Sequence, residues 1–168
     1  MISFAPIDEQ IGRLARGLKS LLADTGRDDP LMVGIRTGGV WVAERLHPAV
    51  KIREPLGTLN INFYRDDFTR IGLHPRVTPS NLPFAVDDRH IILVDDVLHT
   101  GRTIRAAMNE IFDYGRPASV TLAVLVQRHG RELPIQADVA AQEVTLAAGQ
   151  HVKLVGPDPL ELVLQESS

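Results

Sequence analysis

The sequence of 168 residues contains no cysteine, which excludes disulfides and thiolate metal sites and fits a reducing cytoplasm. It has no apolar run long enough to span a membrane, and its first ten residues, MISFAPIDEQ, lack the layout of a signal peptide. It also lacks GxxxxGK(S/T), the loop that nucleoside triphosphatases need, and the GxGxxG of dinucleotide-binding folds. We therefore expect a cytoplasmic protein with no membrane partner and neither of these nucleotide sites.

An excess of basic charge is missing as well. The chain has 18 basic and 21 acidic residues and a net charge of −3, which argues against a strongly basic nucleic-acid-binding domain. A local basic face stays possible, for example on Arg13, Arg16 and Lys19, which lie three apart and can share one side of a helix. The length and the hydrophobic content of 44% suit one α/β domain over residues 1–168.

Apolar runs and helix signals alternate along the chain. Helices are expected from a cap at Asp8 through Leu22, from Val40 to about Leu46, and from Thr100 to about Asp113. Strands are expected over 31–35, 56–64, 91–94 and 119–126, with strand-like pieces at 137–140, 151–155 and 160–164. This order predicts a mostly parallel sheet flanked by helices. Residues 65–88 have no periodicity and predict a long functional or disordered loop.

The most informative segment is IILVDDVLHTGRT, residues 91–103. Its apolar run predicts a buried strand that ends in Asp95 and Asp96; a four-residue turn then leads into a helix. Free amides and the positive dipole end of that helix attract a phosphate, and Gly101 lets the backbone approach closely. The carboxylates can accept hydrogen bonds from a ribose diol or hold a hydrated Mg²⁺. A phosphate-and-sugar site explains these residues better than a buried strand with a capped helix.

A second turn, Arg36-Thr37-Gly38-Gly39, also follows a buried strand and precedes a helix. Such a turn can direct backbone N–H groups at an anion. Two adjacent glycines permit conformations closed to other residues, although a tight strand-to-helix turn can use them for geometry alone.

Residues 91–103 resemble the phosphoribosyl-diphosphate (PRPP) signature of type I phosphoribosyltransferases at all thirteen positions. Together with NINFYRDDF and the QRHGRELP of residues 127–134, they resemble the PyrR family, whose members combine RNA-binding attenuation of pyrimidine genes with uracil phosphoribosyltransferase activity. The resemblance covers about residues 8–165. It implies a single-domain type I phosphoribosyltransferase fold with a long flexible loop and a small C-terminal hood.

The resemblance also implies the reaction uracil + PRPP ⇌ UMP + diphosphate, with Mg²⁺ bound to PRPP. The implied catalytic residues are Asp95, Asp96, His99 and Arg65, with Asp95 and Asp96 also as metal ligands. The implied substrate-binding residues are Thr37, Gly38, Gly39, Val97, Leu98, Thr100, Gly101, Arg102, Thr103 and Arg128. Consecutive strand residues point to opposite faces, so both carboxylates reach one ligand only if the extended conformation ends between them. Otherwise one of the pair braces the loop.

Several positions depart from the family pattern. Gly38 stands in place of a basic residue and His99 in place of a tyrosine, His129 and Gly130 are exchanged, and Gln136 replaces a basic residue. His99 then acts as a proton donor or acceptor, or only packs. Two alternatives stay open: a regulator that keeps the pocket only as a sensor, and a phosphoribosyltransferase for another base. The expected partners are PRPP, uracil, UMP or UTP, an mRNA leader, and further copies in a homodimer or higher homo-oligomer.

Overall fold

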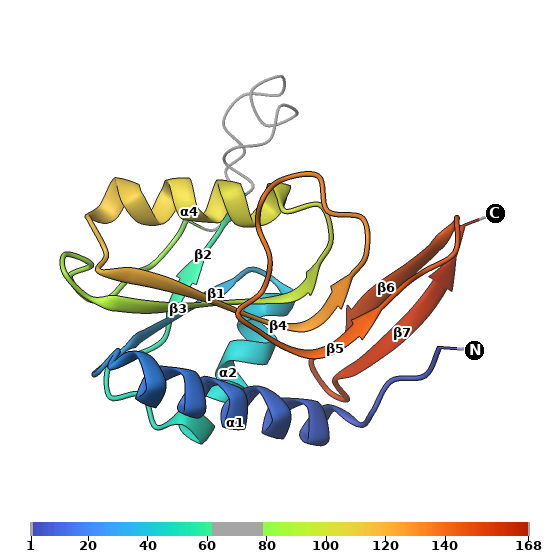
Figure 1. Cartoon of the computed structure of the whole chain (residues 1–168), viewed down its shortest axis with the longest axis horizontal. Coiled ribbons are helices and arrows are strands. Elements are labelled where there is room, and N and C mark those ends of the chain that lie inside the picture. The colour runs from blue at the N-terminus through green and yellow to red at the C-terminus, as the bar shows by residue number, and fades with distance from the viewer. Residues whose placement is uncertain (1, 62–78, 168) are drawn as a thin grey trace.

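The structure is a computed structural model that describes residues 2–61 and 79–167 (Figure 1). In chain order these residues form α1 (Ile7–Thr25), β1 (Leu31–Ile35), α2 (Gly38–Val50), β2 (Gly57–Leu59), β3 (His90–Leu98), α4 (Arg102–Tyr114), β4 (Ser119–Arg128), β5 (Val139–Val144), β6 (Gln150–Val155) and β7 (Glu161–Glu166).

Five of the strands form one parallel sheet in the order β2-β1-β3-β4-β5. Helices α1 and α2 lie on one face of this sheet and α4 lies on the other (Figure 1). The predicted α/β architecture, a mostly parallel sheet flanked by helices, is therefore confirmed. In a parallel sheet all strands end at the same edge, so the turns after β1 and β3 are brought close together.

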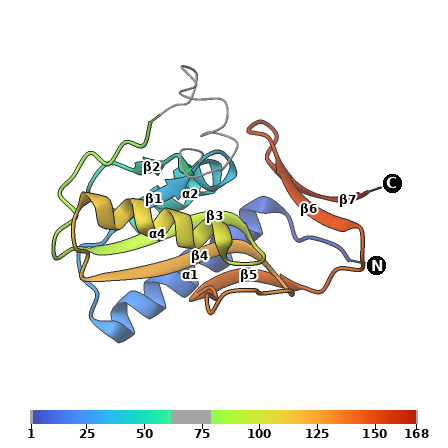
Figure 2. The ribbon, with the colours of Figure 1, turned by 90° about the horizontal axis from the view of Figure 1, so that it is seen from above.

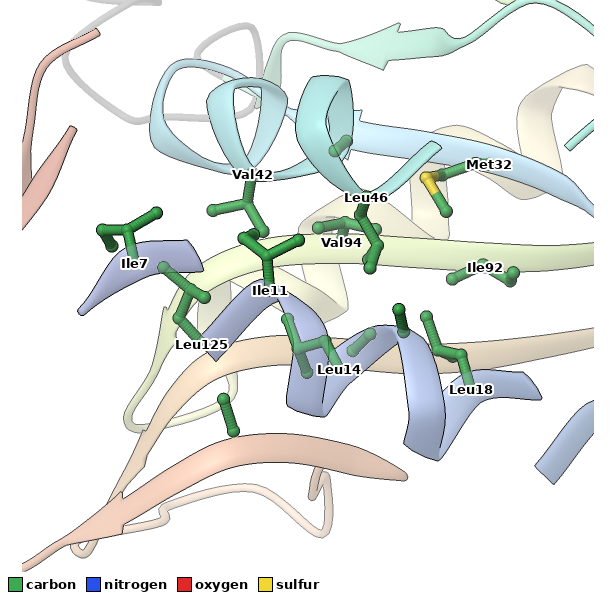
Figure 3. Close-up of a cluster of buried hydrophobic side chains, with 14 of the residues drawn as sticks. Ile7, Ile11, Leu14, Leu18, Met32, Val42, Leu46, Ile92, Val94 and Leu125 are labelled. Atoms are coloured by element: carbon green, nitrogen blue, oxygen red, sulfur yellow. The ribbon is translucent and has the colours of Figure 1, made fainter. Parts of the chain in front are cut away.

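The alternation of side chains along β3 supplies the core on both faces. Ile92 and Val94 pack with α1 and α2, whereas Ile91 and Leu93 pack with α4. Figure 3 shows the first cluster, where Ile11, Leu14 and Leu18 of α1 meet Val42 and Leu46 of α2 over Ile92 and Val94. Because both faces of β3 are covered, its ends are the places where polar side chains can meet a ligand.

The helices begin and end slightly differently from the prediction. The cap at Asp8 is wrong: α1 begins at Ile7 after Pro6, and Asp8 lies in the first turn, where a negative charge favours the helix dipole. Helix α1 stops at Gly26, whose φ of 66° is the left-handed conformation expected of a C-cap glycine. Helix α2 is longer than predicted, since it already begins at Gly38 and continues to Val50.

The strand boundaries also shift. Strand β3 continues to Leu98, so the predicted four-residue turn after Asp96 is wrong and only three residues separate β3 from α4. Of the predicted strand 56–64, only Gly57–Leu59 is strand, and residues 62–64 lie outside the described part. The predicted loop is described from residue 79, where a single antiparallel bridge joins Asn81 to Thr58.

The last two strands, β6 and β7, form an antiparallel hairpin that stands beside the five-stranded sheet (Figure 2). Leu154 and Leu160 of this hairpin region are buried in the core cluster that contains α1. The hairpin corresponds to the small C-terminal hood that the sequence predicted. Within residues 2–61 and 79–167, no helix has the length and apolarity needed to traverse a membrane.

Candidate active site

The acidic pair lies near the end of β3, against the first turn of α2. Asp95 is only 6% exposed, and its Oδ1 accepts a hydrogen bond from the Asp96 amide at 2.8 Å. Asp96 is half-buried, and its Oδ1 accepts from the Val97 amide at 2.8 Å. Burial, reinforced by the charge of Asp96, raises the pKa of Asp95 well above its ordinary value. Each carboxylate is thus held against the backbone that follows it.

Strand β3 does not end between the two carboxylates, yet its facing pattern changes there. Val94 and Val97 both pack toward the cluster of α1 and α2, whereas Leu93 and Leu98 belong to the cluster of α4. A regular strand would put residues three apart on opposite faces. The alternation is therefore interrupted at the acidic pair, which removes the objection that Asp95 and Asp96 must point to opposite sides of the sheet.

Two glycines bring the turn after β1 against this pair. A Cβ at Gly39 would lie 2.6 Å from the Val94 carbonyl oxygen and 3.2 Å from Asp95 Oδ1. A Cβ at Gly38 would lie 2.8 Å from Asp96 Cγ. A side chain at Gly39 would displace the backbone of β3, and one at Gly38 would displace the Asp96 carboxylate, so both glycines permit close packing here in addition to any freedom of the turn.

The turn itself leaves backbone donors available. Thr37 is exposed and precedes α2, and its carbonyl oxygen accepts from the amides of Val40 and Trp41 at 3.2 and 3.3 Å. The peptide bond between Arg36 and Thr37 is cis. Because the first helical hydrogen bonds come from Val40 and Trp41, the amides of Gly38 and Gly39 have no intrahelical acceptor. They lie beside the acidic pair and can receive an anion.

The other turn of the candidate site, His99–Thr103, connects β3 to α4. Gly101 has a φ of 97°, and the Arg102 amide donates to Thr100 Oγ1 at 3.2 Å. The first helical bond joins the Arg105 amide to the Gly101 carbonyl at 3.0 Å. The amides of Thr103 and Ile104 therefore lack an intrahelical acceptor, as a phosphate site at a helix N-terminus requires.

The segment after β4 holds the turn His99–Thr103 in place. The Thr100 carbonyl oxygen accepts from the amides of Glu132 and Leu133, both at 3.0 Å. The Arg102 side chain is mostly exposed and donates from Nε to Glu132 Oε1 at 2.9 Å. The structure thus directs Nε of the Arg102 guanidinium to Glu132 and the Arg102 amide to Thr100.

A cavity of about 610 Å³ opens beside the turn, at the carboxyl ends of β3, β4 and β5. It is lined by Leu98, His99, Gln127, Arg128, His129, Gly130, Arg131, Ile135, Gln136, Glu143, Val144 and Thr145. A cavity of this size, adjoining the turn between β3 and α4 and lined by amide, guanidinium and imidazole groups, has the volume and chemistry to receive a heterocyclic base.

His99 and Gly130, two of the departures from the family pattern, are neighbours in this cavity. Gly130 has a φ of 117°, and a Cβ there would lie 2.9 Å from His99 Nε2. Desolvation, followed by the charge of Arg128, lowers the pKa of His99. The ring is therefore biased toward its neutral form, in which it can both donate and accept a hydrogen bond.

Hydrogen bonds join several of the side chains that line the cavity, and one of these residues, Glu143, was not singled out by the sequence. Gln127 Nε2 donates to Glu143 Oε1 at 3.1 Å, and Arg131 donates to Gln136 Oε1 at 3.0 Å. Arg128 Nε is buried without a hydrogen-bond partner among the described residues, so this N–H group can donate to a ligand in the cavity. Glu143 belongs to no motif, and only the pairing of β5 with β4 brings it to the cavity.

The structure gathers most of the predicted residues at one sheet edge. Asp95 and Asp96 meet Gly38 and Gly39, and Leu98, His99 and Arg128 line the adjoining cavity. Val97 instead packs toward the core. Arg65 lies outside the described residues. No cluster of three or more histidine, aspartate or glutamate side chains suited to a metal ion occurs within residues 2–61 and 79–167.

Comparison with known proteins gives a consistent result. The phosphoribosyl transferase domain family matches residues 7–154. The chain is 64% identical over 161 residues to the bifunctional protein PyrR of Nitrosococcus oceani, a match that covers 95% of this chain and 91% of that protein. It is 59% identical over 154 residues to the bifunctional protein PyrR of Pseudomonas paraeruginosa, covering 92% and 91%.

Among solved structures the fold is similar to hypoxanthine phosphoribosyltransferases. A structure of the Trypanosoma cruzi enzyme has a TM-score of 0.64 at 20% identity, covering 84% of this chain and 77% of that one. A hypoxanthine phosphoribosyltransferase from Staphylococcus aureus has a TM-score of 0.58 at 16% identity, covering 81% and 74%. At such identities the likeness concerns the fold alone.

Proposed function

This chain belongs to the PyrR family of phosphoribosyltransferases. We propose that Asp95, Asp96 and the adjoining cavity form the site that transfers a phosphoribosyl group from PRPP to uracil. The products are UMP and diphosphate. The observation that carries the proposal is the contact of the Gly38–Gly39 turn with the Asp95–Asp96 pair, because it joins two anion-binding turns around one set of carboxylates.

Each part of PRPP has a matching group. The amides of Thr103 and Ile104, with the Thr100 and Thr103 hydroxyls, would hold the 5′-phosphate. The carboxylates of Asp95 and Asp96 would accept hydrogen bonds from the ribose hydroxyls. The turn of Thr37 to Gly39 would bind the diphosphate through backbone amides. The base would then occupy the cavity that His99 and Arg128 line.

The chemistry asks the protein for positioning and electrostatics. As the bond from C1′ to the diphosphate oxygen breaks, positive charge builds on the ribose ring and negative charge on the leaving group. The bond from C1′ to uracil N1 forms, and N1 loses its proton. Carboxylates beside the ring favour the first charge and amide donors at the glycine turn favour the second. Neutral His99 is placed to hydrogen-bond the base and to accept a proton.

Magnesium fits this site as a companion of PRPP. Mg²⁺ is commonly held by one or two carboxylates together with substrate oxygens and water, and Asp95 and Asp96 supply two carboxylates. When bound, the ion would neutralise charge on the diphosphate. Asp96 is the better ligand of the two, because it is half-buried whereas Asp95 is almost fully enclosed and its pKa is raised.

The regulatory half of the function is supported by the relatives, which are called bifunctional protein PyrR. We propose that UMP or UTP in the same cavity controls binding to a pyrimidine-gene mRNA leader, and that the protein works as a dimer or higher homo-oligomer. The name also favours an enzyme with a regulatory role over a protein that only senses the nucleotide. On the basic face that Arg13, Arg16 and Lys19 can share, Arg13 donates to Glu9 and to the Ala141 carbonyl.

The test is UMP formation from labelled uracil, PRPP and Mg²⁺, with hypoxanthine as a competing base. We expect uracil to be used, and Asp96→Asn to lower kcat/KM by about a hundredfold or more because a charge beside the reacting ribose is lost. The exposed Asp24→Asn in α1 is the matched control and should leave the rate unchanged. Absence of UMP with the wild-type protein, or full activity of Asp96→Asn, would reject the proposal.

A further inference from the structure

Helix α4 buries a carboxylate that the proposed reaction does not use. Glu110 is 9% exposed, and its Oε1 accepts a hydrogen bond from Ser80 Oγ at 2.5 Å. Its Oε2 is buried without a hydrogen-bond partner in the part of the chain that the structure describes. Burial raises the pKa of Glu110 above its ordinary value of 4.5, and the bond from Ser80 partly offsets this. An apolar residue here would avoid the free-energy cost of burying a carboxylate and an unpaired oxygen, which suggests that Glu110 has a function.

Glu110 terminates a chain of hydrogen bonds that begins at the glycine turn. Ser80 Oγ, which donates to Glu110, accepts from the Asn60 amide at 2.8 Å. The carbonyl of the same peptide group, Leu59 O, accepts from the Arg36 amide at 2.9 Å. Every donor in this chain points the same way, from Arg36 to the carboxylate. Hydrogen bonds aligned in this manner polarise and strengthen one another.

The chain of hydrogen bonds connects the glycine turn to the interior of helix α4. Arg36 opens the turn that contains Thr37 and the two glycines, and α4, which contains Glu110, begins within the turn His99–Thr103. Paired hydrogen bonds between Thr58 and Asn81, both 2.8 Å long, keep Ser80 beside β2. Glu110 is thus linked to the Arg36 backbone through protein groups alone, by the route of Ser80 and the Leu59–Asn60 peptide.

We propose that Glu110 is a positioning residue for the diphosphate turn, acting through Ser80 and the peptide between Leu59 and Asn60. The carboxylate polarises that peptide and strengthens the hydrogen bond from the Arg36 amide to the Leu59 carbonyl. This bond fixes the position of the turn and therefore of the backbone donors of Thr37, Gly38 and Gly39. The inference rests on the proposed role of this turn in binding diphosphate. It adds a residue that touches no substrate and that no motif contains.

The test compares Ser80→Ala and Glu110→Gln with the wild-type protein. Calorimetry should show that the dissociation constant for diphosphate rises about three- to tenfold in both variants, the effect of one lost or weakened hydrogen bond. The KM for PRPP should rise to a similar extent, while affinity for UMP, which does not reach the turn, stays within about twofold. The double variant should add little, since both substitutions act on one chain.

Melting temperatures separate positioning from a structural role. Glu110→Gln should melt no lower than the wild-type protein at neutral pH, because a neutral amide keeps the acceptor and removes a buried charge. Ser119→Ala is the matched control: this hydroxyl bonds His90 Nδ1 at 2.7 Å at the opposite end of β3, and its loss should leave diphosphate affinity unchanged.

Unchanged diphosphate affinity in both variants, or an equal loss of affinity for diphosphate and UMP, would overturn the positioning role. A wild-type protein that binds neither PRPP nor UMP would overturn the proposed function itself, and the inference with it.

Discussion

At the residue scale, the buried carboxylate of Asp95 weakens the fold, and in the proposed function it also binds the ribose. Asp95 is enclosed by Gly39 and the end of β3, and its pKa is raised first by burial and then by the charge of Asp96. A folded-state pKa above the unfolded value of 3.8 means that ionisation of Asp95 favours unfolding. Its contribution to stability is complete below pH 3.8 and is lost as the pH rises through the folded-state pKa.

Asp95→Asn should therefore stabilise the protein at neutral pH while it impairs PRPP binding. The asparagine keeps an acceptor for the Asp96 amide and carries no charge to desolvate. Chemical denaturation measured from pH 4 to 8 should give a flatter stability curve for the variant. A variant that is less stable than the wild-type protein throughout this range would contradict the account.

The candidate site residues could be predicted where they belong to a contiguous motif. Asp95, Asp96 and Gly101 were identified from a strand, an acidic tip and a glycine turn. Glu110 and Glu143 could not be, because each looks like an ordinary charged residue in its element. Their hydrogen bonds to Ser80 and Gln127 form only when α4 and β5 are packed against the sheet.

At the element scale, the first turn of α2 and the end of β3 determine one another. The prediction placed the start of α2 at Val40, because apolar spacing begins there, and missed that Gly38 and Gly39 are already helical. It also ended β3 too early, since propensity disfavours aspartate in strands. Pairing of β3 with β4, which extends to Leu98, overrides that preference.

This packing gives a prediction about Gly38. The family pattern has a basic residue there, which suggests that Gly38→Lys would strengthen diphosphate binding. In this structure a Cβ at position 38 would displace the Asp96 carboxylate, so we expect both Gly38→Ala and Gly38→Lys to raise the KM for PRPP several-fold. Steady-state kinetics on both variants decide the matter: tighter PRPP binding in Gly38→Lys than in the wild-type protein would show that charge outweighs the steric effect.

At the scale of the whole molecule, the parallel sheet explains why the function can be read from short motifs. Turns after β1, β3 and β4 are far apart in sequence and meet at the carboxyl edge, as α/β topology requires. That convergence was predictable. The position of the hairpin of β6 and β7, and the shape of the cavity, depend on side-chain packing that no pattern encodes.

The most direct measurement is a crystal structure of the protein with UMP. The account predicts the phosphate at the amides of Thr103 and Ile104, the ribose hydroxyls on Asp95 and Asp96, and the base beside His99. A nucleotide bound elsewhere, with that edge of the sheet empty, would contradict it.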